Sequence, residues 1–144
     1  MNAQTTILLI EDNPSDIRLI REALRDNPRA LQLEIAGDGD EALQFLRKED
    51  TFQNCPTPDI ILLDLNIPKR SGLELLEIIK TDKCLKTIPV LILSTSTADE
   101  DILQAYRRHA NCYISKPFAL DHFNRAIDVT IDFWTQVVAL PPRE

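Results

Sequence analysis

IILLDLNIP, residues 60–68, consists of four consecutive apolar residues, a carboxylate at Asp64, and a short segment that ends at Pro68. A short, fully apolar run of this kind is typical of a central strand that is buried on both faces of a sheet. Such a strand would place Asp64 at its C-terminal end, and ligands bind beyond that edge in open α/β sheets. The stretch therefore predicts a buried strand that presents one functional carboxylate.

Three other apolar runs also end in polar side chains. The runs are residues 6–10, 89–93 and 112–115, and the polar residues are Glu11, Asp12, Ser94 and Lys116. If the strands are parallel, their carboxyl ends meet at one edge of the sheet. We therefore expect carboxylates, hydroxyls and one ammonium group to gather there, a combination suited to a divalent metal ion and a phosphoryl group.

Strand-like runs alternate with amphipathic helical segments five times, which favours a doubly wound α/β domain. Residues 31–35 alternate between apolar and polar side chains, as expected for an outer strand that is wet on one side. Helices are predicted after Asn13, from about residue 39, after Gly72, over residues 99–109, and from about residue 120 past Trp134.

The composition restricts the class of protein. A chain of 144 residues that is 44% hydrophobic suits one globular domain with a core. A net charge of −7 speaks against nucleic-acid binding, which needs a basic surface. No stretch approaches the ~20 apolar residues that span a bilayer, and the N-terminus lacks a signal-peptide pattern. We therefore expect no membrane association and a cytoplasmic location. Three widely spaced cysteines indicate neither a disulfide framework nor a zinc site.

The carboxylates at the predicted edge fit metal-assisted phosphoryl chemistry. Glu11, Asp12 and Asp64 can supply oxygen ligands to Mg²⁺, and three neighbouring carboxylates repel one another unless a cation lies among them. Asp64 can also act as a nucleophile that forms an aspartyl phosphate. Lys116 can contact a phosphoryl oxygen as a compact point charge, although a surface lysine is the common alternative. Ser94 can donate to a phosphoryl oxygen, or it can simply begin a loop or cap a helix.

Four motifs match a known family. They are residues 10–13 (IEDN), 63–68 with Ser71 and Gly72, 94–96 (STS) and 113–118 (YISKPF). Together they resemble the receiver domain of two-component response regulators, in family order and over nearly the whole chain. The resemblance implies a flavodoxin-like fold, with a five-stranded parallel sheet of order 2-1-3-4-5 and five helices. It also implies a single receiver domain over about residues 5–137. Because little of the 144 residues lies outside the five strand–helix units, we expect no separate output domain.

The resemblance assigns the phosphoacceptor and the metal ligands. It implies that Asp64 accepts phosphate from a phosphohistidine of a sensor histidine kinase. It further implies that Mg²⁺ (or Mn²⁺) is bound by Glu11, Asp12, Asp64 and the backbone carbonyl of Asn66. Such a domain is not an enzyme in the usual sense, because it catalyses only its own phosphorylation and dephosphorylation.

The resemblance also assigns a switch. Ser94 takes the place of the family's switch hydroxyl, Lys116 that of the phosphate-contacting lysine, and Tyr113 that of the aromatic residue that changes rotamer. Asn66 and Ser96 occupy positions that tune the rate of dephosphorylation. A cis bond between Lys116 and the following proline would fix the direction of the lysine side chain. The surface predicted to change on phosphorylation comprises the fourth helix, fifth strand and fifth helix.

A narrower resemblance concerns stand-alone regulators that serve bacterial phytochromes and related kinases. It is carried by residues 11–17, by residues 110–113, and by the tail from Phe133 to Pro141. It implies a phytochrome-type kinase as the partner and a tail that joins two subunits.

The apolar residues of the tail favour a homodimer independently of this resemblance. One helix on a sheet needs a single apolar stripe, yet the chain end carries a second apolar surface. We predict that residues 138–144 take part in dimerisation and that the interface contains Phe133, Trp134, Val137, Val138 and Leu140. The alternative is a tail that folds back over its own subunit.

Three other functions are alternatives to a receiver that acts as a terminal switch. A phosphorelay intermediary would use the same chemistry and pass the phosphoryl group on to a histidine phosphotransfer protein. A phosphatase with an aspartyl nucleophile needs a second acid two residues later, where this chain has Asn66, which cannot act as a general acid. A flavin-binding carrier of the same fold is disfavoured because Glu11 and Asp12 would repel the flavin phosphate.

Overall fold

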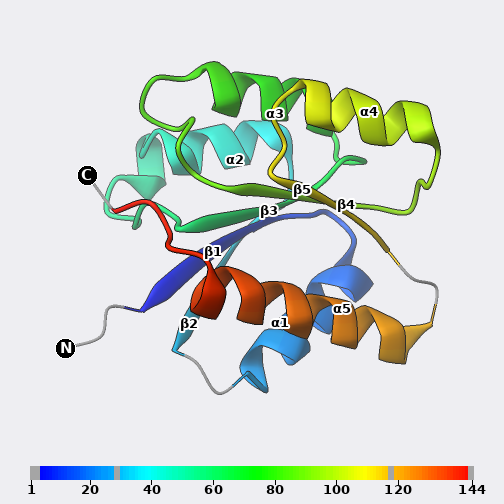
Figure 1. Cartoon of the computed structure of the whole chain (residues 1–144). Coiled ribbons are helices and arrows are strands. Elements are labelled where there is room, and N and C mark those ends of the chain that lie inside the picture. Colours follow the sequence, from blue (N-terminus) through cyan, green and yellow to red (C-terminus); the bar gives the residue numbers. More distant parts are fainter. Residues whose placement is uncertain (1–3, 28–29, 117–118, 143–144) are drawn as a thin grey trace.

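The computed structural model describes residues 4–27, 30–116 and 119–142. Its centre is a parallel sheet with the order β2-β1-β3-β4-β5 (Figure 1), as predicted. The strands are β1 (Thr5–Ile10), β2 (Leu31–Ala36), β3 (Ile60–Asp64), β4 (Val90–Ser94) and β5 (Cys112–Ser115). The outer position of β2 and the central position of β3 both agree with the sequence patterns.

Five α-helices cover the two faces of the sheet. They are α1 (Pro14–Arg25), α2 (Gly39–Leu46), α3 (Gly72–Thr81), α4 (Asp99–Arg107) and α5 (Leu120–Asp132). Helices α1 and α5 lie side by side on one face, and α2, α3 and α4 lie on the other (Figure 1). A short 3₁₀ helix, η1 (Asp50–Phe52), follows α2, and a π-helical turn, η2 (Phe133–Val137), extends α5.

Two helix ends differ from the sequence prediction. Helix α4 was expected to reach His109 but ends at Arg107, because His109 adopts a φ of 70° and the Ala110 amide donates to the Ala105 carbonyl. The chain remains helical past Trp134 as predicted, but only in the π form. The reason is the hydrogen bond from the Val138 amide to the Phe133 carbonyl, five residues back.

The central strands are apolar throughout because both of their faces are buried. Ile61 and Leu63 of β3 pack into the core under α2, α3 and α4, whereas Ile60 and Leu62 pack into the core under α1 and α5. All four side chains have no exposed surface. Alternate residues of one strand thus serve two cores, which is why the run shows no apolar–polar alternation.

Neither a disulfide nor a helix able to cross a membrane occurs in the described part of the chain. Cys84 is exposed, whereas Cys112 is half-buried and packs against the core under α1 and α5. Burial raises the pKa of the Cys112 thiol to about 11, despite an opposing interaction with Trp134. This thiol therefore behaves as a small packing residue rather than as a nucleophile.

Gly72 joins α3 to the loop that follows Asp64. Its amide donates to the Leu65 carbonyl at 3.0 Å. A Cβ atom at Gly72 would lie 2.4 Å from the Leu65 Cα, and 2.8 and 2.9 Å from the carbonyl oxygens of Leu65 and Asp64. All three atoms belong to the backbone, so no side chain can move aside. The absence of a side chain at residue 72 therefore allows α3 to support the end of β3.

We expect Gly72→Ala to lower the free energy of unfolding by about 1–3 kcal/mol, because the added methyl group must displace backbone. The matched control is Gly37→Ala, whose Cβ would meet only the Glu41 carboxylate at 3.7 Å. The control should stay within about 0.5 kcal/mol of the parent chain. Urea denaturation of the three proteins measures both values, and equal stability of the two variants would contradict the role given to Gly72.

Candidate functional site

The carboxyl ends of four strands bring the predicted polar residues together. Glu11 follows β1, Asp64 and Ser94 are the last residues of β3 and β4, and Lys116 follows β5. The register pairs Asp64 with Leu93 and Ser94 with Ser115, so the strand ends are level. The Lys116 amide extends the ladder by donating to the Ser94 carbonyl at 2.7 Å. The sequence prediction that these side chains share one edge is confirmed.

The Lys116 ammonium lies at the centre of this cluster. Its Nζ atom is 2.5 Å from Asp64 Oδ2, 2.7 Å from Glu11 Oε1 and 2.8 Å from Asp16 Oδ2. The side chains of Lys116 and Asp64 are only 8% and 7% exposed, and that of Glu11 is 1% exposed. An ammonium group has three hydrogen-bond donors, so each N–H of Lys116 has its own carboxylate.

The site shifts the pKa values of two of its groups. Burial raises the pKa of Glu11 to about 8, and the neighbouring Asp64 carboxylate adds to this effect, while Lys116 opposes it. Burial disfavours the charge of Lys116, but the hydrogen bonds to Asp16, Asp64 and Glu11 outweigh it and raise the pKa of the ammonium above 10.5. The lysine is thus held as a cation that compensates for buried negative charge.

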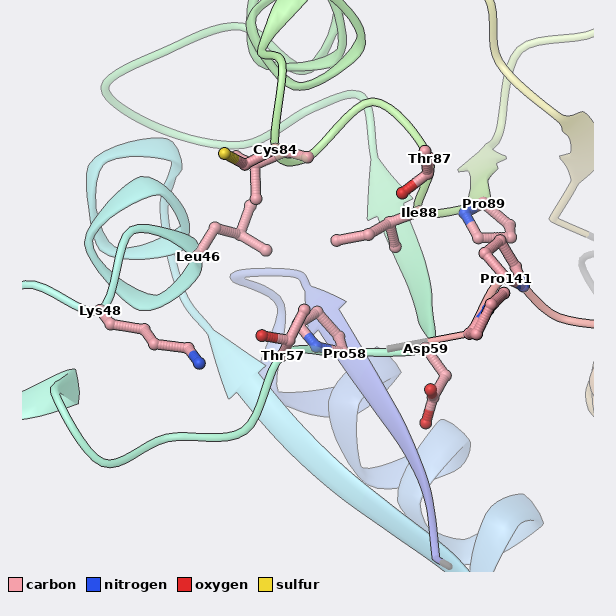
Figure 2. Close-up of a pocket in the computed structure, with 12 residues that line it drawn as sticks. Leu46, Lys48, Thr57, Pro58, Asp59, Cys84, Thr87, Ile88, Pro89 and Pro141 are labelled. Atoms are coloured by element: carbon pink, nitrogen blue, oxygen red, sulfur yellow. The ribbon is translucent and has the colours of Figure 1, made fainter. Parts of the chain in front are cut away.

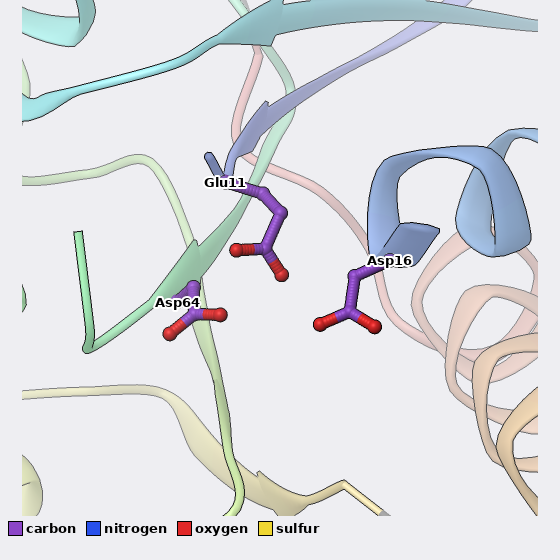
Figure 3. Close-up of side chains that lie close together, drawn as sticks. All are labelled: Glu11, Asp16 and Asp64. Carbon is purple, nitrogen blue, oxygen red and sulfur yellow. The ribbon is translucent and has the colours of Figure 1, made fainter. Parts of the chain in front are cut away.

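Asp16 belongs to the cluster, although the sequence analysis did not single it out. Glu11, Asp16 and Asp64 offer carboxylate oxygens that all lie within 4.8 Å of one another (Figure 3). Asp12, one of the four predicted metal ligands, is exposed, and its amide donates to Glu11 Oε2 at 3.2 Å. The metal-binding role of Asp12 stays a prediction. A signal for Asp16 was available, because it is an acidic residue in the first turn of the helix that directly follows β1.

The first turn of α1 fixes the backbone of Asp16. The Asn13 side chain caps the helix by accepting from the amides of Ser15 at 2.9 Å and Asp16 at 3.2 Å. Pro14 occupies the first helical turn, where its lack of an N–H costs nothing. The positive end of the helix dipole also favours a carboxylate at this position.

The loop after Asp64 folds back onto the carboxylate. The Asn66 amide donates to Asp64 Oδ1 at 2.7 Å, while Lys116 occupies Oδ2. Both oxygens of Asp64 are therefore hydrogen bonded. Asn66 itself is an exposed residue.

The predicted switch residues are connected by hydrogen bonds. Ser94 is 3% exposed, and its Oγ accepts from the Ser96 amide at 3.1 Å. The Tyr113 hydroxyl donates to the Ser96 carbonyl at 3.0 Å. The Ser96 hydroxyl in turn donates to Asp101 and accepts from the Ala98 amide, and so tethers the start of α4. Ser94 is thus followed by a loop, as the alternative reading of this serine predicted, and the loop also contacts Tyr113.

The predicted cis bond involves Pro117, which lies outside the described residues.

The apolar residues of the tail divide into two groups. Trp134 and Leu140 pack against the chain's own core under α1 and α5, as the fold-back alternative held. Phe133 and Val137 are 49% and 72% exposed. Val138 is half-buried. The assignment of all five residues to a dimer interface stays a prediction, and the exposed group is the better candidate.

A cavity of about 230 Å³ lies at the other end of the sheet (Figure 2). Its lining includes Asp59 and Pro89, which directly precede β3 and β4, and Pro141 from the tail. The carboxylate cluster is at the opposite ends of the same strands. This cavity is therefore separate from the site at Asp64.

The raised pKa of Glu11 predicts how stability depends on pH. A protonated Glu11 favours the folded state, so this contribution is complete below the ordinary pKa of 4.5 and is lost as the pH rises through about 8. In EDTA, the free energy of unfolding of the parent chain, compared with that of Glu11→Gln, should therefore fall as the pH rises from about 5 to about 8. Urea denaturation across this range measures the difference, and a difference that is constant with pH would contradict the prediction.

Comparison with known proteins places this geometry in a family. Residues 7–128 match the model of the response regulator receiver domain. The response regulator Rcp1 of Synechocystis sp. is 39% identical over 140 residues, which cover 97% of this chain and 95% of Rcp1.

Two solved structures are similar over almost their full length. The phosphorylated cyanobacterial phytochrome response regulator RcpA has a TM-score of 0.94 and 44% identity, over 97% of this chain and 100% of that one. The Mn²⁺-bound form of Rcp1 has a TM-score of 0.91 and 39% identity, over 96% and 99% of the two chains. The strand order, the level strand ends and the Asp64–Lys116 pair thus have a common explanation: the chain belongs to the response regulator receiver domain family.

Proposed function

We propose that this chain receives a phosphoryl group on Asp64 from a phosphohistidine of a sensor histidine kinase. An Asp64 carboxylate oxygen attacks phosphorus, the P–N bond breaks, and the electron pair of that bond remains on the imidazole. This proposal rests mainly on the environment of the Asp64 carboxylate. The carboxylate is almost buried, and it accepts hydrogen bonds from Lys116 and from the Asn66 amide. These two donors are placed to contact oxygens of the transferred group.

The donor set fits a hard divalent cation. Glu11, Asp16 and Asp64 present only oxygen atoms, within 4.8 Å of one another, and oxygen ligands are those that Mg²⁺ and Mn²⁺ prefer. The Lys116 ammonium lies among the same carboxylates, which indicates that a cation is favoured there. We infer that two of these residues, Glu11 and Asp64, hold Mg²⁺ together with Asp12 and the backbone carbonyl of Asn66. A bound metal ion would neutralise charge on the phosphoryl oxygens.

The hydrogen bonds from Ser94 to Tyr113 provide a route for the signal. When Ser94 turns its hydroxyl toward a phosphoryl oxygen, the Ser96 amide loses its present acceptor. The loop then shifts, and the Tyr113 hydroxyl loses or moves its contact with the Ser96 carbonyl. The surface formed by α4, β5 and α5 changes as a result. Asn66 and Ser96, next to the acceptor and in the switch loop, would tune the lifetime of the phosphoryl group.

The kinase partner is inferred from the relatives. RcpA is named as a phytochrome response regulator and is 44% identical over nearly the whole chain. A bacterial phytochrome kinase is therefore the proposed donor. The chain would act as an enzyme only on its own phosphoryl group, because Asn66 stands where an aspartyl phosphatase needs an acid. Transfer from the phosphorylated chain to a histidine phosphotransfer protein would assign it to a phosphorelay instead of a terminal switch.

We further propose a homodimer through the exposed face of α5 and η2. Val129, Phe133 and Val137 are 57%, 49% and 72% exposed, and their spacing of four residues places them along one side of the helical segment. An exposed apolar stripe of this kind is typical of an interface. A second copy of the chain is its simplest partner, because two such stripes are complementary about a twofold axis.

Asp64→Asn should abolish phosphorylation. We expect acetyl phosphate with Mg²⁺ to add one phosphoryl group to the parent chain and none to Asp64→Asn, because an amide is not a nucleophile toward phosphorus. Intact-protein mass spectrometry with and without EDTA measures the adduct. Asp50→Asn, an exposed residue of η1, is the control and should be labelled like the parent chain. Full labelling of Asp64→Asn would refute the assigned acceptor.

Val137→Ser should raise the dissociation constant of the dimer about tenfold or more, since it removes an anchor of the exposed stripe. Leu103→Ser is the control, because Leu103 is an exposed apolar residue of α4, at 44%, outside the stripe. Sedimentation velocity over a range of concentrations measures the dissociation constant. An unchanged constant for Val137→Ser would remove the stripe from the interface.

A further inference from the structure

Asp16 is the partner of Lys116 to which the proposed function assigns neither the metal ion nor the phosphoryl group. It comes from α1, 100 residues away from Lys116, and its Oδ2 lies 2.8 Å from the ammonium. Its side chain is 27% exposed, whereas the other two partners are almost completely buried. Figure 3 shows its carboxylate turned toward Glu11 and Asp64 from the first turn of α1.

The three hydrogen bonds of Lys116 have different fates when Asp64 gains a phosphoryl group. Asp64 is converted to an acyl phosphate, and its oxygens then carry the transferred group. Glu11 is committed to the metal ion in the proposed function. The Asp16 carboxylate has neither of these roles, so it can keep the same hydrogen bond to Lys116 before and after the transfer.

An anchor is needed because a lysine side chain is long and flexible. Its four-carbon stem has several freely rotating bonds, so an unanchored ammonium group would sample many positions. The Asp16 backbone, in contrast, is fixed by the Asn13 cap and Pro14. The rigid partner can therefore orient the flexible one.

We propose that Asp16 is a positioning residue that holds the Lys116 ammonium over Asp64 while the phosphoryl group is gained and lost. The hydrogen bond from Lys116 to Asp64 Oδ2 is replaced by one to a phosphoryl oxygen, and the hydrogen bond to Asp16 persists. Asp16 acts through Lys116 and not as a direct ligand of the metal ion. This inference rests on the proposed function of Asp64.

A double-mutant cycle tests the inference. The four proteins are the parent chain, Asp16→Asn, Lys116→Met and the double variant, and the ligand is beryllofluoride with Mg²⁺, which mimics the acyl phosphate. Isothermal titration calorimetry gives each affinity. In the parent chain, we expect Asp16→Asn to weaken beryllofluoride binding about tenfold, or about 1.4 kcal/mol. In the Lys116→Met chain, the same substitution should leave beryllofluoride binding unchanged. Mg²⁺ affinity without beryllofluoride should change less than about twofold.

Two further variants separate positioning from a general effect of charge or folding. Glu22→Gln removes a carboxylate from the same helix, where it pairs with Arg18 at the surface, and it should bind beryllofluoride like the parent chain. Asp16→Glu retains the carboxylate and should recover part of the lost affinity. Circular dichroism and urea denaturation identify any variant whose fold is damaged, and the comparison between Asp16→Glu and Asp16→Asn then carries the test.

The possible results are distinct. If Asp16→Asn weakens beryllofluoride binding equally in the parent chain and in Lys116→Met, the inference is overturned. Asp16 would then act independently of Lys116. A large loss of Mg²⁺ affinity alone would overturn it in favour of a direct metal ligand. Parent-like binding by Asp16→Asn would also overturn it while leaving the proposed function intact. A parent chain that binds no beryllofluoride and gains no phosphoryl group would refute the proposed function itself.

Discussion

The hydrogen bonds of the Lys116 ammonium tie together the chain segments that form the site. Three carboxylates, one directly after β1, one at the end of β3 and one in α1, lie at one edge of the sheet, and two of them are almost fully buried. Buried charges are costly unless they are paired and hydrogen bonded. The single ammonium of Lys116, which directly follows β5, donates a hydrogen bond to each of the three carboxylates. The four chain segments must therefore meet within a few ångströms for the site to exist.

The apolar sheet provides the rigidity that this cluster requires. Both faces of β3 are buried, so Asp64 is carried at the end of a strand that cannot shift without exposing a core. Gly72 brings α3 against the loop after Asp64, and the Asn13 cap directs α1 toward the same edge. The cluster contains three carboxyl groups and one ammonium group, so the acidic groups outnumber the cation. Such a local excess of charge is expected where function requires a metal ion and a phosphoryl group.

Much of the fold follows from local patterns. The continuous apolar runs predict the central strands, because only strands buried on both faces lack polar alternation. Asn13, Gly72 and the prolines predict where helices begin, since caps and turns depend on neighbouring residues alone. The end of α4 and the π form of η2 were less accessible, because they depend on the φ angle of His109 and on one hydrogen bond from Val138. The strand order came from family resemblance and not from periodicity.

Local patterns predicted that Glu11, Asp64, Ser94 and Lys116 lie together, because the parallel strands of a doubly wound sheet align their carboxyl ends. The packing of the folded chain places Asp16 in this group and leaves Asp12 exposed. It also decided that Trp134 packs inward while Phe133 and Val137 remain outside. In each case the choice depends on the direction of a helix relative to the sheet. That direction is fixed by packing between segments far apart in the chain, which a local pattern does not encode.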